Sequence, residues 1–341
     1  MGIQSTLLAL NDRHAKEDGA EAEGAGDARV PVRRLTGKWS WDRRLACANQ
    51  LVVSFQPDWV SLQYVPYGFQ KKGLPFFLPK HLESLGGKFR WHVMCHELWI
   101  EPKGGWIKRV LSGLQKALVM ELCRSLKPGK VHTSIPYYRE RLEAAGVGCG
   151  ELPLFGNIPV VLQEIPSRED EWTFAFFGSL RNGWEPEPLL SRIELARASA
   201  GKSRCRFISI GRLGETGEKI WEQMEQIGYA NFVFEKRGEL SAVDISRELQ
   251  SADFGIAVSP HHLLGKSGAV AAMRDHGLPV IVNRMVPGSA PAPGASVRAP
   301  RTEILLDDQF SQNLAAAKRV PARESLPEVA EAFLMSLKNP E

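Results

Sequence analysis

Short apolar runs alternate along the chain with longer segments in which apolar residues recur every three or four positions. The short runs are typical of buried strands, and the longer segments are typical of helices with one apolar face. The run Leu7-Leu8-Ala9-Leu10 predicts an opening strand over 5–11. The further elements predicted in the first half are strands at 59–64, 89–95 and 130–134, and helices at 41–55, 73–85, 105–126 and 137–145. Residues 16–29, rich in Ala, Gly, Glu and Asp, predict a solvated loop, and 151–155 leads into a turn at Gly156-Asn157.

The same alternation resumes after a polar, proline-containing stretch at 159–171, which has the composition of a linker between domains. The strands predicted in this second half lie at 172–177, 205–210, 231–235, 254–258 and 279–283. The predicted helices lie at 188–198, 215–227, 242–251, 267–275 and 326–337. The Pro- and Ala-rich stretch at 286–299 predicts a loop.

Strands with apolar interiors that alternate with helices indicate parallel sheets covered on both faces. Two such series in one chain predict an α/β protein made of two Rossmann-like domains that face one cleft. We place the N-terminal domain at 1–162 and the C-terminal domain at 163–324. A last helix, at 325–341, could pack back on the N-terminal domain.

Composition narrows the class of protein. The 341 residues are 43% hydrophobic and 24% charged, which is typical of a globular protein, and no apolar run reaches the roughly 20 residues of a membrane span. The start of the chain lacks the pattern of a secretory signal, and five scattered cysteines suit reduced thiols, so we expect a cytoplasmic protein. The net charge of +4 is too small to indicate nucleic-acid binding, although basic stretches could meet anionic ligands or lipid headgroups.

The clearest candidate for binding an anion is the stretch Gly265-Lys266-Ser267-Gly268, where a helix is predicted to start. The free N–H groups and the positive end of such a helix attract a phosphate. Lys266 would add a charge, and Ser267 would cap the helix or donate to a phosphate. The alternative is that Ser267 only caps the helix and Lys266 is solvated.

Two further candidates follow predicted strands of the second half, where ligands bind in parallel sheets. Arg212 could hold a phosphate through its guanidinium, or it could be a surface arginine paired with Glu215 or Glu218. Gly178-Ser179 could let a ligand approach the backbone closely, or Gly178 could simply form a tight turn.

Histidines supply the candidates for catalysis. His92, Cys95 and His96 have a spacing that suggests a metal, but no fourth ligand follows at a zinc-like interval. We favour His96 as a neutral imidazole at a strand end facing the cleft, with a half-buried structural histidine as the alternative. His262, in the pair that follows Pro260, could also reach the cleft.

The predicted helix at 105–126 has an apolar stripe with basic neighbours. The stripe comprises Ile107, Val110, Leu111, Leu114, Leu118 and Leu122, and the basic residues are Lys103, Lys108, Arg109 and Lys116. Such a helix can rest on an anionic membrane surface, but such a stripe is more often the core face of a domain helix, which is the interpretation we favour.

Several stretches together resemble a known family. They are 131–134 (VHTS), 154–159 (LFGNIP), 176–180 (FFGSL), 208–213 (ISIGRL), 251–257 (SADFGIA), 266–273 (KSGAVAAM) and 276–281 (HGLPVI). In order and spacing the chain resembles nucleotide-sugar-dependent glycosyltransferases of the two-Rossmann GT-B fold, nearest to glycosyltransferase family 4.

The resemblance implies transfer of a hexosyl group from a nucleotide-diphosphate sugar, with retention, to an acceptor that is a sugar, a glycan or a lipid-linked molecule. It implies no metal and no other cofactor, and no nucleic-acid partner. In this setting we assign donor binding to Gly178, Ser179, Arg212 and the stretch Lys266-Ser267-Gly268, with the diphosphate at the last of these. The resemblance assigns His96 to the donor sugar, and His262 is the candidate substitute for a sugar-contacting glutamate. Lipid-linked acceptors would bring the protein to the inner face of the membrane.

The sequence departs from this family in two ways. The usual pair of glutamates is absent, since those positions fall on Leu263 or Leu264 and on Ala271 or Ala272. The opening strand and glycine-rich loop are also missing, so we expect that the first strand–helix unit is absent or that the start is misplaced. These departures favour a second hypothesis, a catalytically silent GT-B module that binds a sugar, a nucleotide or a partner protein. Epimerisation of a nucleotide sugar is a third.

Overall fold

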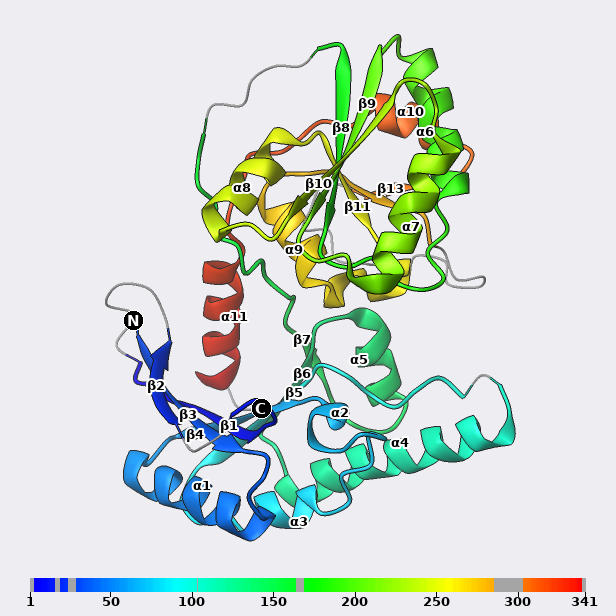
Figure 1. Ribbon diagram of the computed structural model, residues 1–341. Helices are drawn as coiled ribbons and strands as arrows, with labels where there is room; N and C mark the ends of the chain where they lie inside the picture. Colours follow the sequence, from blue (N-terminus) through cyan, green and yellow to red (C-terminus); the bar gives the residue numbers. More distant parts are fainter. Residues whose placement is uncertain are drawn as a thin grey trace. The chain divides into compact units, whose positions relative to one another are not determined.

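The computed structural model describes residues 3–15, 19–23, 29–102, 104–163, 169–284 and 303–338 (Figure 1). The chain forms two compact units. The first comprises Met1–Thr133 and Tyr138–Gly150, and the second comprises Ser134–Tyr137 and Glu151–Lys338. Within the described residues, no helix has both the length and the hydropathy needed to cross a bilayer.

The first unit begins with a three-stranded sheet of order β1-β3-β2. Its strands are β1 (Leu7–Asp12), β2 (Gly19–Glu23) and β3 (Val30–Thr36); β1 runs parallel to β3, and β2 runs antiparallel to it. The prediction of a loop over 16–29 is therefore wrong at β2, and β3 was not predicted. The alternation Gly-Ala-Glu-Ala-Glu is weakly apolar, so the pairing with β3, which satisfies its backbone groups, defines the strand.

A second sheet of the first unit has the order β4-β5-β6-β7. Its strands are β4 (Trp59–Tyr64), β5 (Arg90–Cys95), β6 (Lys130–Thr133) and β7 (Gly150–Glu151), with β4, β5 and β6 parallel. The helices of this region are α1 (Trp41–Phe55), α2 (Pro66–Phe69), α3 (Leu78–Glu83), α4 (Trp106–Leu126) and α5 (Pro136–Glu143). The predicted helix over 73–85 shrinks to α3, because Gly73 has a φ of +67° and Pro75 restricts Leu74 to an extended conformation.

The second unit is a six-stranded, fully parallel sheet of order β10-β9-β8-β11-β12-β13. Its strands are β8 (Glu171–Phe177), β9 (Arg204–Ile210), β10 (Phe232–Gly238), β11 (Phe254–Ala257), β12 (Val280–Val282) and β13 (Glu303–Leu305). In chain order this is the 3-2-1-4-5-6 arrangement of a Rossmann fold. The order changes direction between β8 and β11, and ligands bind outside the carboxyl ends of strands at such a point.

Helices of the second unit lie on both faces of its sheet, whereas α11 (Leu326–Lys338) stands apart from the sheet (Figure 1). The other helices are α6 (Glu187–Ser199), α7 (Gly214–Ile227), α8 (Ala242–Ser251), the 3₁₀ turn η1 (His261–Lys266), α9 (Gly268–Asp275) and α10 (Phe310–Ala316). The α/β class and the second-half helices are confirmed, whereas β13 and α10 were not predicted. The predicted loop at 286–299 lies outside the described residues.

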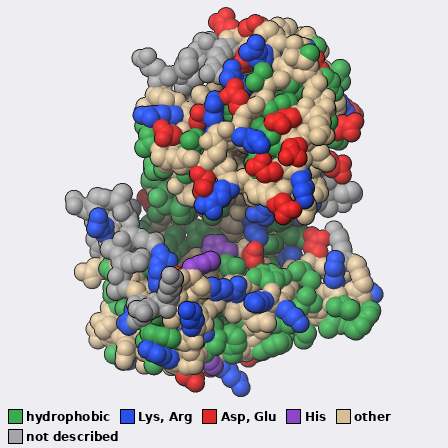
Figure 2. All heavy atoms as spheres, in the orientation of Figure 1, with side chains coloured by type: hydrophobic (Ala, Val, Ile, Leu, Met, Phe, Trp, Pro, Cys, Tyr) green, Lys and Arg blue, Asp and Glu red, His purple; other side chains and the backbone are tan. Residues whose placement is uncertain are grey.

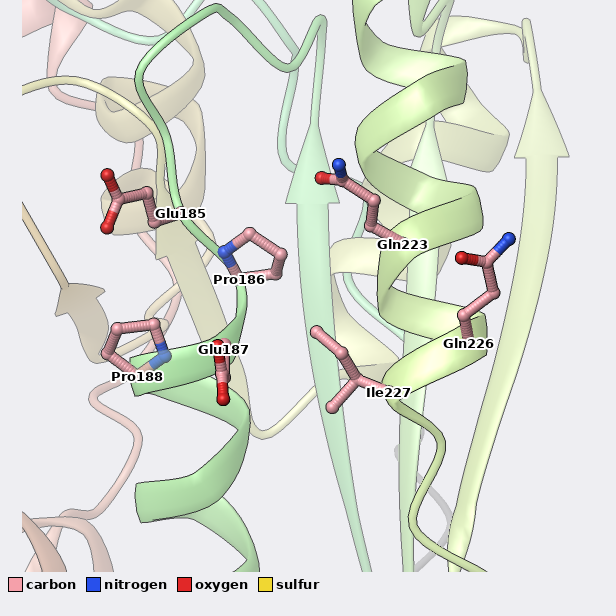
Figure 3. A pocket seen from close by; sticks show the side chains of 7 residues that line it. All are labelled: Glu185, Pro186, Glu187, Pro188, Gln223, Gln226 and Ile227. Atoms are coloured by element: carbon pink, nitrogen blue, oxygen red, sulfur yellow. The ribbon is translucent and has the colours of Figure 1, made fainter.

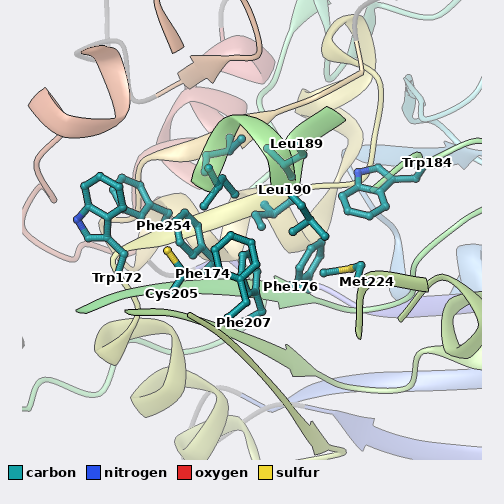
Figure 4. Packing of buried hydrophobic residues seen from close by; sticks show 14 of the residues in the cluster. Trp172, Phe174, Phe176, Trp184, Leu189, Leu190, Cys205, Phe207, Met224 and Phe254 are labelled. Carbon is teal, nitrogen blue, oxygen red and sulfur yellow. The ribbon is translucent and has the colours of Figure 1, made fainter. Parts of the chain in front are cut away.

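An aromatic core holds this sheet against α6 and α7 (Figure 4). The ring of Phe174 on β8 is fully buried and stacks between Phe207 of β9 and Phe254 of β11, with ring centroids 5.0 and 5.1 Å apart. Trp184, in the loop after β8, packs its edge against Phe176. This packing fixes the register of the neighbouring strands, and therefore the positions of the residues that follow them.

Candidate functional site

Three neighbouring strands of the second unit end in glycine. Gly178, Gly211 and Gly238 follow or close β8, β9 and β10 and have φ angles of +85°, +97° and +66°, which other residues adopt only with strain. The N–H of Gly178 donates to the carbonyl of Ile210 at 2.8 Å, and the N–H of Gly211 donates to that of Gly238 at 2.7 Å. A Cβ placed on Gly178 or Gly238 would meet no atom within 4 Å. At Gly178 and Gly238, therefore, no side chain covers the backbone at this edge of the sheet.

Arg212 and Ser179 extend from this glycine edge. Both side chains are exposed, and the Nε of Arg212 lies 2.7 Å from a carboxylate oxygen of Glu239, which follows β10. Pairing with Glu215 or Glu218 is therefore wrong, since those two bind Lys219 and Lys236, each at 2.8 Å. The hydrogen bond from Arg212 lowers the pKa of Glu239. Because the Arg212–Glu239 pair is in water, it contributes little to stability, and an incoming phosphate can replace the carboxylate.

The stretch after β11 brings a helix N-terminus to the other side of the switch point. Residues 261–266 form η1, and α9 begins at Gly268 with Ser267 as its N-cap, whose hydroxyl accepts from the N–H of Val270 at 3.3 Å. A Cβ on Gly268 would meet nothing within 4 Å, so the start of α9 is open. The first N–H groups of a helix have no carbonyl partner within it, so those of Gly268 and Ala269 are candidate donors to a bound anion. Lys266, half-buried, is the last residue of η1.

The two histidines of η1 have different surroundings. The Nε2 of His261 lies 3.0 Å from a carboxylate oxygen of Glu303, which also pairs with Arg274. The His261 hydrogen bond, followed by the charge of Arg274, lowers the pKa of Glu303. His261 is therefore held in an ion-pair cluster within the second unit. The ring of His262 lies edge-on against Tyr137, with centroids 5.0 Å apart, and its proposed role stays a prediction.

The sequence pattern missed Arg284 on the same edge of the sheet. Its carbonyl accepts from the N–H of His261 at 3.0 Å, and a Cβ on Gly183 would lie 3.3 Å from its guanidinium. Arg284 follows β12 as Arg212 follows β9, so a basic residue just after a predicted strand was the signal available. It adds a cation beside the loop that follows β8.

A chain of polar side chains crosses the second sheet of the first unit and ends at His96. The Nε2 of His96 lies 2.8 Å from the Oε1 of Gln63, and the amide nitrogen of Gln63 donates to the hydroxyl of Ser61 at 2.8 Å. That hydroxyl lies 2.7 Å from the Nδ1 of His92, whose Nε2 lies 3.0 Å from the Nδ1 of His132. Because an amide oxygen can only accept, the Nε2–H of His96 donates the hydrogen bond to Gln63.

The metal interpretation of His92, Cys95 and His96 does not match this geometry. His92 and Cys95 are three positions apart on β5, so their side chains point to opposite faces of the sheet. Burial lowers the pKa of His92 to about 3, with His132 acting in the same direction, and burial raises the pKa of Cys95. Among the residues that the structure describes, no group of three His, Cys, Asp or Glu side chains could hold a metal ion.

A separate hollow of the second unit lies beside its helices (Figure 3). It has a volume of about 470 Å³ and lies between the start of α6 and the second half of α7. Its lining comprises Glu185, Pro186, Glu187, Pro188, Gln223, Gln226 and Ile227. Two carboxylates and no cation make this hollow unsuitable for a diphosphate.

No protein-family model matches the sequence, and no curated protein sequence matches it. Solved structures do share its fold. One, described as trehalose-6-phosphate from E. coli bound with UDP-2-fluoro glucose, has a TM-score of 0.55 at 10% identity and covers 97% of this chain and 88% of that chain. A lipopolysaccharide outer core galactosyltransferase, WaaB, in its apo form, has a TM-score of 0.53 at 15% identity, over 91% of this chain and 84% of the other.

A third structure comes from a study of trehalose-6-phosphate synthase with bisubstrate glycomimetics. Its TM-score is 0.53 at 10% identity, and the match covers 97% of this chain and 90% of that chain. Likeness of this kind extends over nearly the whole of both chains, so the fold of this protein is that of the GT-B glycosyltransferases.

Proposed function

We propose that the protein transfers a hexosyl group from a nucleotide-diphosphate sugar to an acceptor, with retention of anomeric configuration. The observation that carries the proposal is the open carboxyl edge of the second unit, where the bare strand end at Gly178 and the N-terminus of α9 at Gly268 flank the switch point. The GT-B fold supports it, and one similar structure is bound to a uridine-diphosphate sugar analogue.

The chemistry requires stabilisation of a leaving diphosphate as its negative charge grows. The N–H groups at the start of α9 would donate to its oxygens, and Lys266 would add a positive charge next to them. Arg212 would exchange its exposed carboxylate partner, Glu239, for a phosphate oxygen. Gly178 and Ser179 would let the donor lie against the backbone.

The sugar would be held by histidines rather than by the family's glutamates. His96 would contact the donor sugar through its imidazole ring, which Gln63 holds by its Nε2. His262 remains our candidate to take over the role of the glutamate whose position falls on Leu263 or Leu264. In front-face transfer the departing phosphate takes the acceptor proton, so the proposal needs no additional base and assigns no metal or other cofactor. The acceptor is a sugar, a glycan or a lipid-linked molecule.

The second candidate function is a silent module that binds a sugar, a nucleotide or a partner protein without transfer. One observation favours it: the positions that correspond to the two glutamates carry small or apolar side chains, and Leu264 and Ala272 are buried. Binding of a nucleoside diphosphate is common to both functions, whereas turnover of a donor belongs only to the transferase.

The test begins with nucleoside diphosphates. A ligand that binds only the native state raises the melting temperature, so UDP, GDP, ADP and their sugar conjugates are screened by thermal shift and measured by calorimetry. Loss of one hydrogen bond to a charged group costs about 1.5–3 kcal/mol, so Lys266→Ala and Arg212→Ala should each weaken binding at least about tenfold. Lys202→Ala, before β9 at the opposite edge of the sheet, and Arg247→Ala, an exposed arginine paired with Asp244, are the matched controls.

Donor turnover then separates the two functions. Slow hydrolysis of the bound sugar donor, measured as released diphosphate, supports the transferase. Binding without hydrolysis or transfer favours the silent module. If no nucleoside diphosphate binds, the transferase assignment is wrong.

A further inference from the structure

The first half of α4 exposes four large apolar side chains. The exposed fractions are 69% for Trp106, 64% for Ile107, 52% for Val110 and 41% for Leu114. Positions 106, 110 and 114 are spaced four apart, so these side chains form one stripe along the helix, which we call the α4 stripe. Exposed apolar residues are ordinary when single, but a contiguous stripe of this size marks an interaction surface.

The stripe is distinct from the face that α4 buries in its own unit. The buried residues of α4 are Ser112, Gln115, Leu118, Val119, Leu122 and Leu126. The interpretation of 107–122 as a single core stripe is therefore wrong for its first half. The apolar pattern belongs to two faces, one that packs inside the unit from Leu118 onward and one that faces water from Trp106 to Leu114.

The charges that α4 itself places beside the stripe are basic. From Pro102 to Met120 the sequence contains four basic residues and no acidic residue. Glu101 and Glu121 border this segment. Lys108, Arg109 and Lys116 are exposed on α4, and the Lys116 ammonium lies over the ring of Trp99. Among the described residues, Lys108 and Arg109 have no acidic partner. Figure 2 shows hydrophobic side chains together with lysines and arginines on the side of the molecule where α4 lies in Figure 1.

We propose that the α4 stripe and its basic neighbours bind the surface of an anionic lipid bilayer. Apolar side chains that include a tryptophan can enter the boundary between headgroups and acyl chains, while lysines and arginines at their border contact anionic headgroups. Charge complementarity favours an anionic bilayer as the partner, because its headgroups are negative and the acyl chains beneath them are apolar. The inference does not rest on the proposed transferase function.

The experiment is flotation of the full-length protein with lipid vesicles, one set of pure phosphatidylcholine and one of equal parts phosphatidylcholine and phosphatidylglycerol. The protein should float with the anionic vesicles and not with the neutral ones, and rising salt should release it, because salt screens exposed charges. The double variant Trp106→Ser/Ile107→Ser and the double variant Lys108→Glu/Arg109→Glu should each reduce partitioning at least about tenfold.

Matched controls lie on the second unit. Leu195→Ser replaces a leucine of α6 that is 62% exposed, and Arg247→Glu reverses an exposed charge of α8; neither should change flotation. Because the changed side chains are exposed, all variants should fold, which circular dichroism and thermal unfolding check.

Three outcomes would overturn the proposal. In the first, the wild-type protein does not float with the anionic vesicles. In the second, the controls lose binding as much as the α4 variants do. In the third, the protein does not bind vesicles but is a dimer in light scattering, and Trp106→Ser/Ile107→Ser converts that dimer to a monomer. The last result would assign the stripe to a second copy of the chain. No sugar donor is used, so failure here and failure of the transferase proposal are separate results.

Discussion

Replacing Gly268 with alanine should separate ligand binding from folding. Gly268 is the first residue of α9, its φ is not in the left-handed region, and a Cβ there meets no atom within 4 Å. Alanine therefore fits without strain, and by restricting the unfolded chain it stabilises the protein by about 0.4–1 kcal/mol. The free energy of unfolding should stay constant or rise by up to that amount.

The affinity for a nucleoside diphosphate should change in the opposite direction. Cα–Cβ bonds in a helix tilt toward its N-terminus, so the new methyl group occupies the space in front of the N–H groups of Gly268 and Ala269. A phosphate oxygen that accepts from these groups must come within about 2.9 Å of a nitrogen. Loss of one such charge-assisted bond costs about 1.5–3 kcal/mol, which corresponds to a 10- to 150-fold weaker affinity.

The assay combines calorimetry with the best-binding diphosphate and urea unfolding of each protein. Gly113→Ala is the matched control, because Gly113 is an exposed glycine inside α4 whose Cβ would also meet nothing within 4 Å. It should raise the free energy of unfolding by up to about 1 kcal/mol and leave the affinity unchanged. An unchanged affinity in Gly268→Ala, with both variants folded, would refute the assignment of the diphosphate to the start of α9.

Three further predictions concern the described contacts. His261 and Arg274 lower the pKa of Glu303 from 4.5, so the ionised Glu303 stabilises the folded state above pH 4.5. This contribution is lost as the pH falls through the lowered pKa. The free energy of unfolding in urea, measured between pH 3 and 6, should therefore depend less on pH in Glu303→Gln. His92 has a pKa of about 3 against 6.5 for an ordinary histidine, so its ring signals in nuclear magnetic resonance should stay constant from pH 8 to 5, and a midpoint near 6.5 would contradict its burial. Phe174→Ala should lower the free energy of unfolding of the second unit by about 3–5 kcal/mol in urea, while Leu195→Ala, at an exposed position, should change it little.

Local signals in the sequence were enough to predict many elements. The helices at 41–55 and 242–251 and the strand at 59–64 match α1, α8 and β4 to the residue. Both helices start next to a serine, Ser40 or Ser241, whose hydroxyl accepts from the backbone three residues on. Capping and apolar spacing are properties of neighbouring residues, so the sequence shows them directly.

Elements defined by distant partners were missed. The strand β13 has only three residues, and it forms because Glu303, Ile304 and Leu305 pair with β12, more than 20 positions earlier. The same cause limited the site. Gln63, which contacts His96, lies 33 positions from it, and Glu239, which pairs with Arg212, lies on a neighbouring strand end. The sequence indicated which side chains follow strands but not which of them meet.

The glycine ends of β8, β9 and β10 offer only main-chain atoms, and main-chain atoms are the same in every protein. If the proposed donor lies against this edge, the glycines supply no side chain that could distinguish one nucleobase or sugar from another. Under the proposed function, preference among donors would come from the side chains just beyond these glycines, such as Ser179, Arg212 and Arg284. These positions can be exchanged without rebuilding the sheet, which makes them the place to begin if the range of accepted donors is to be altered.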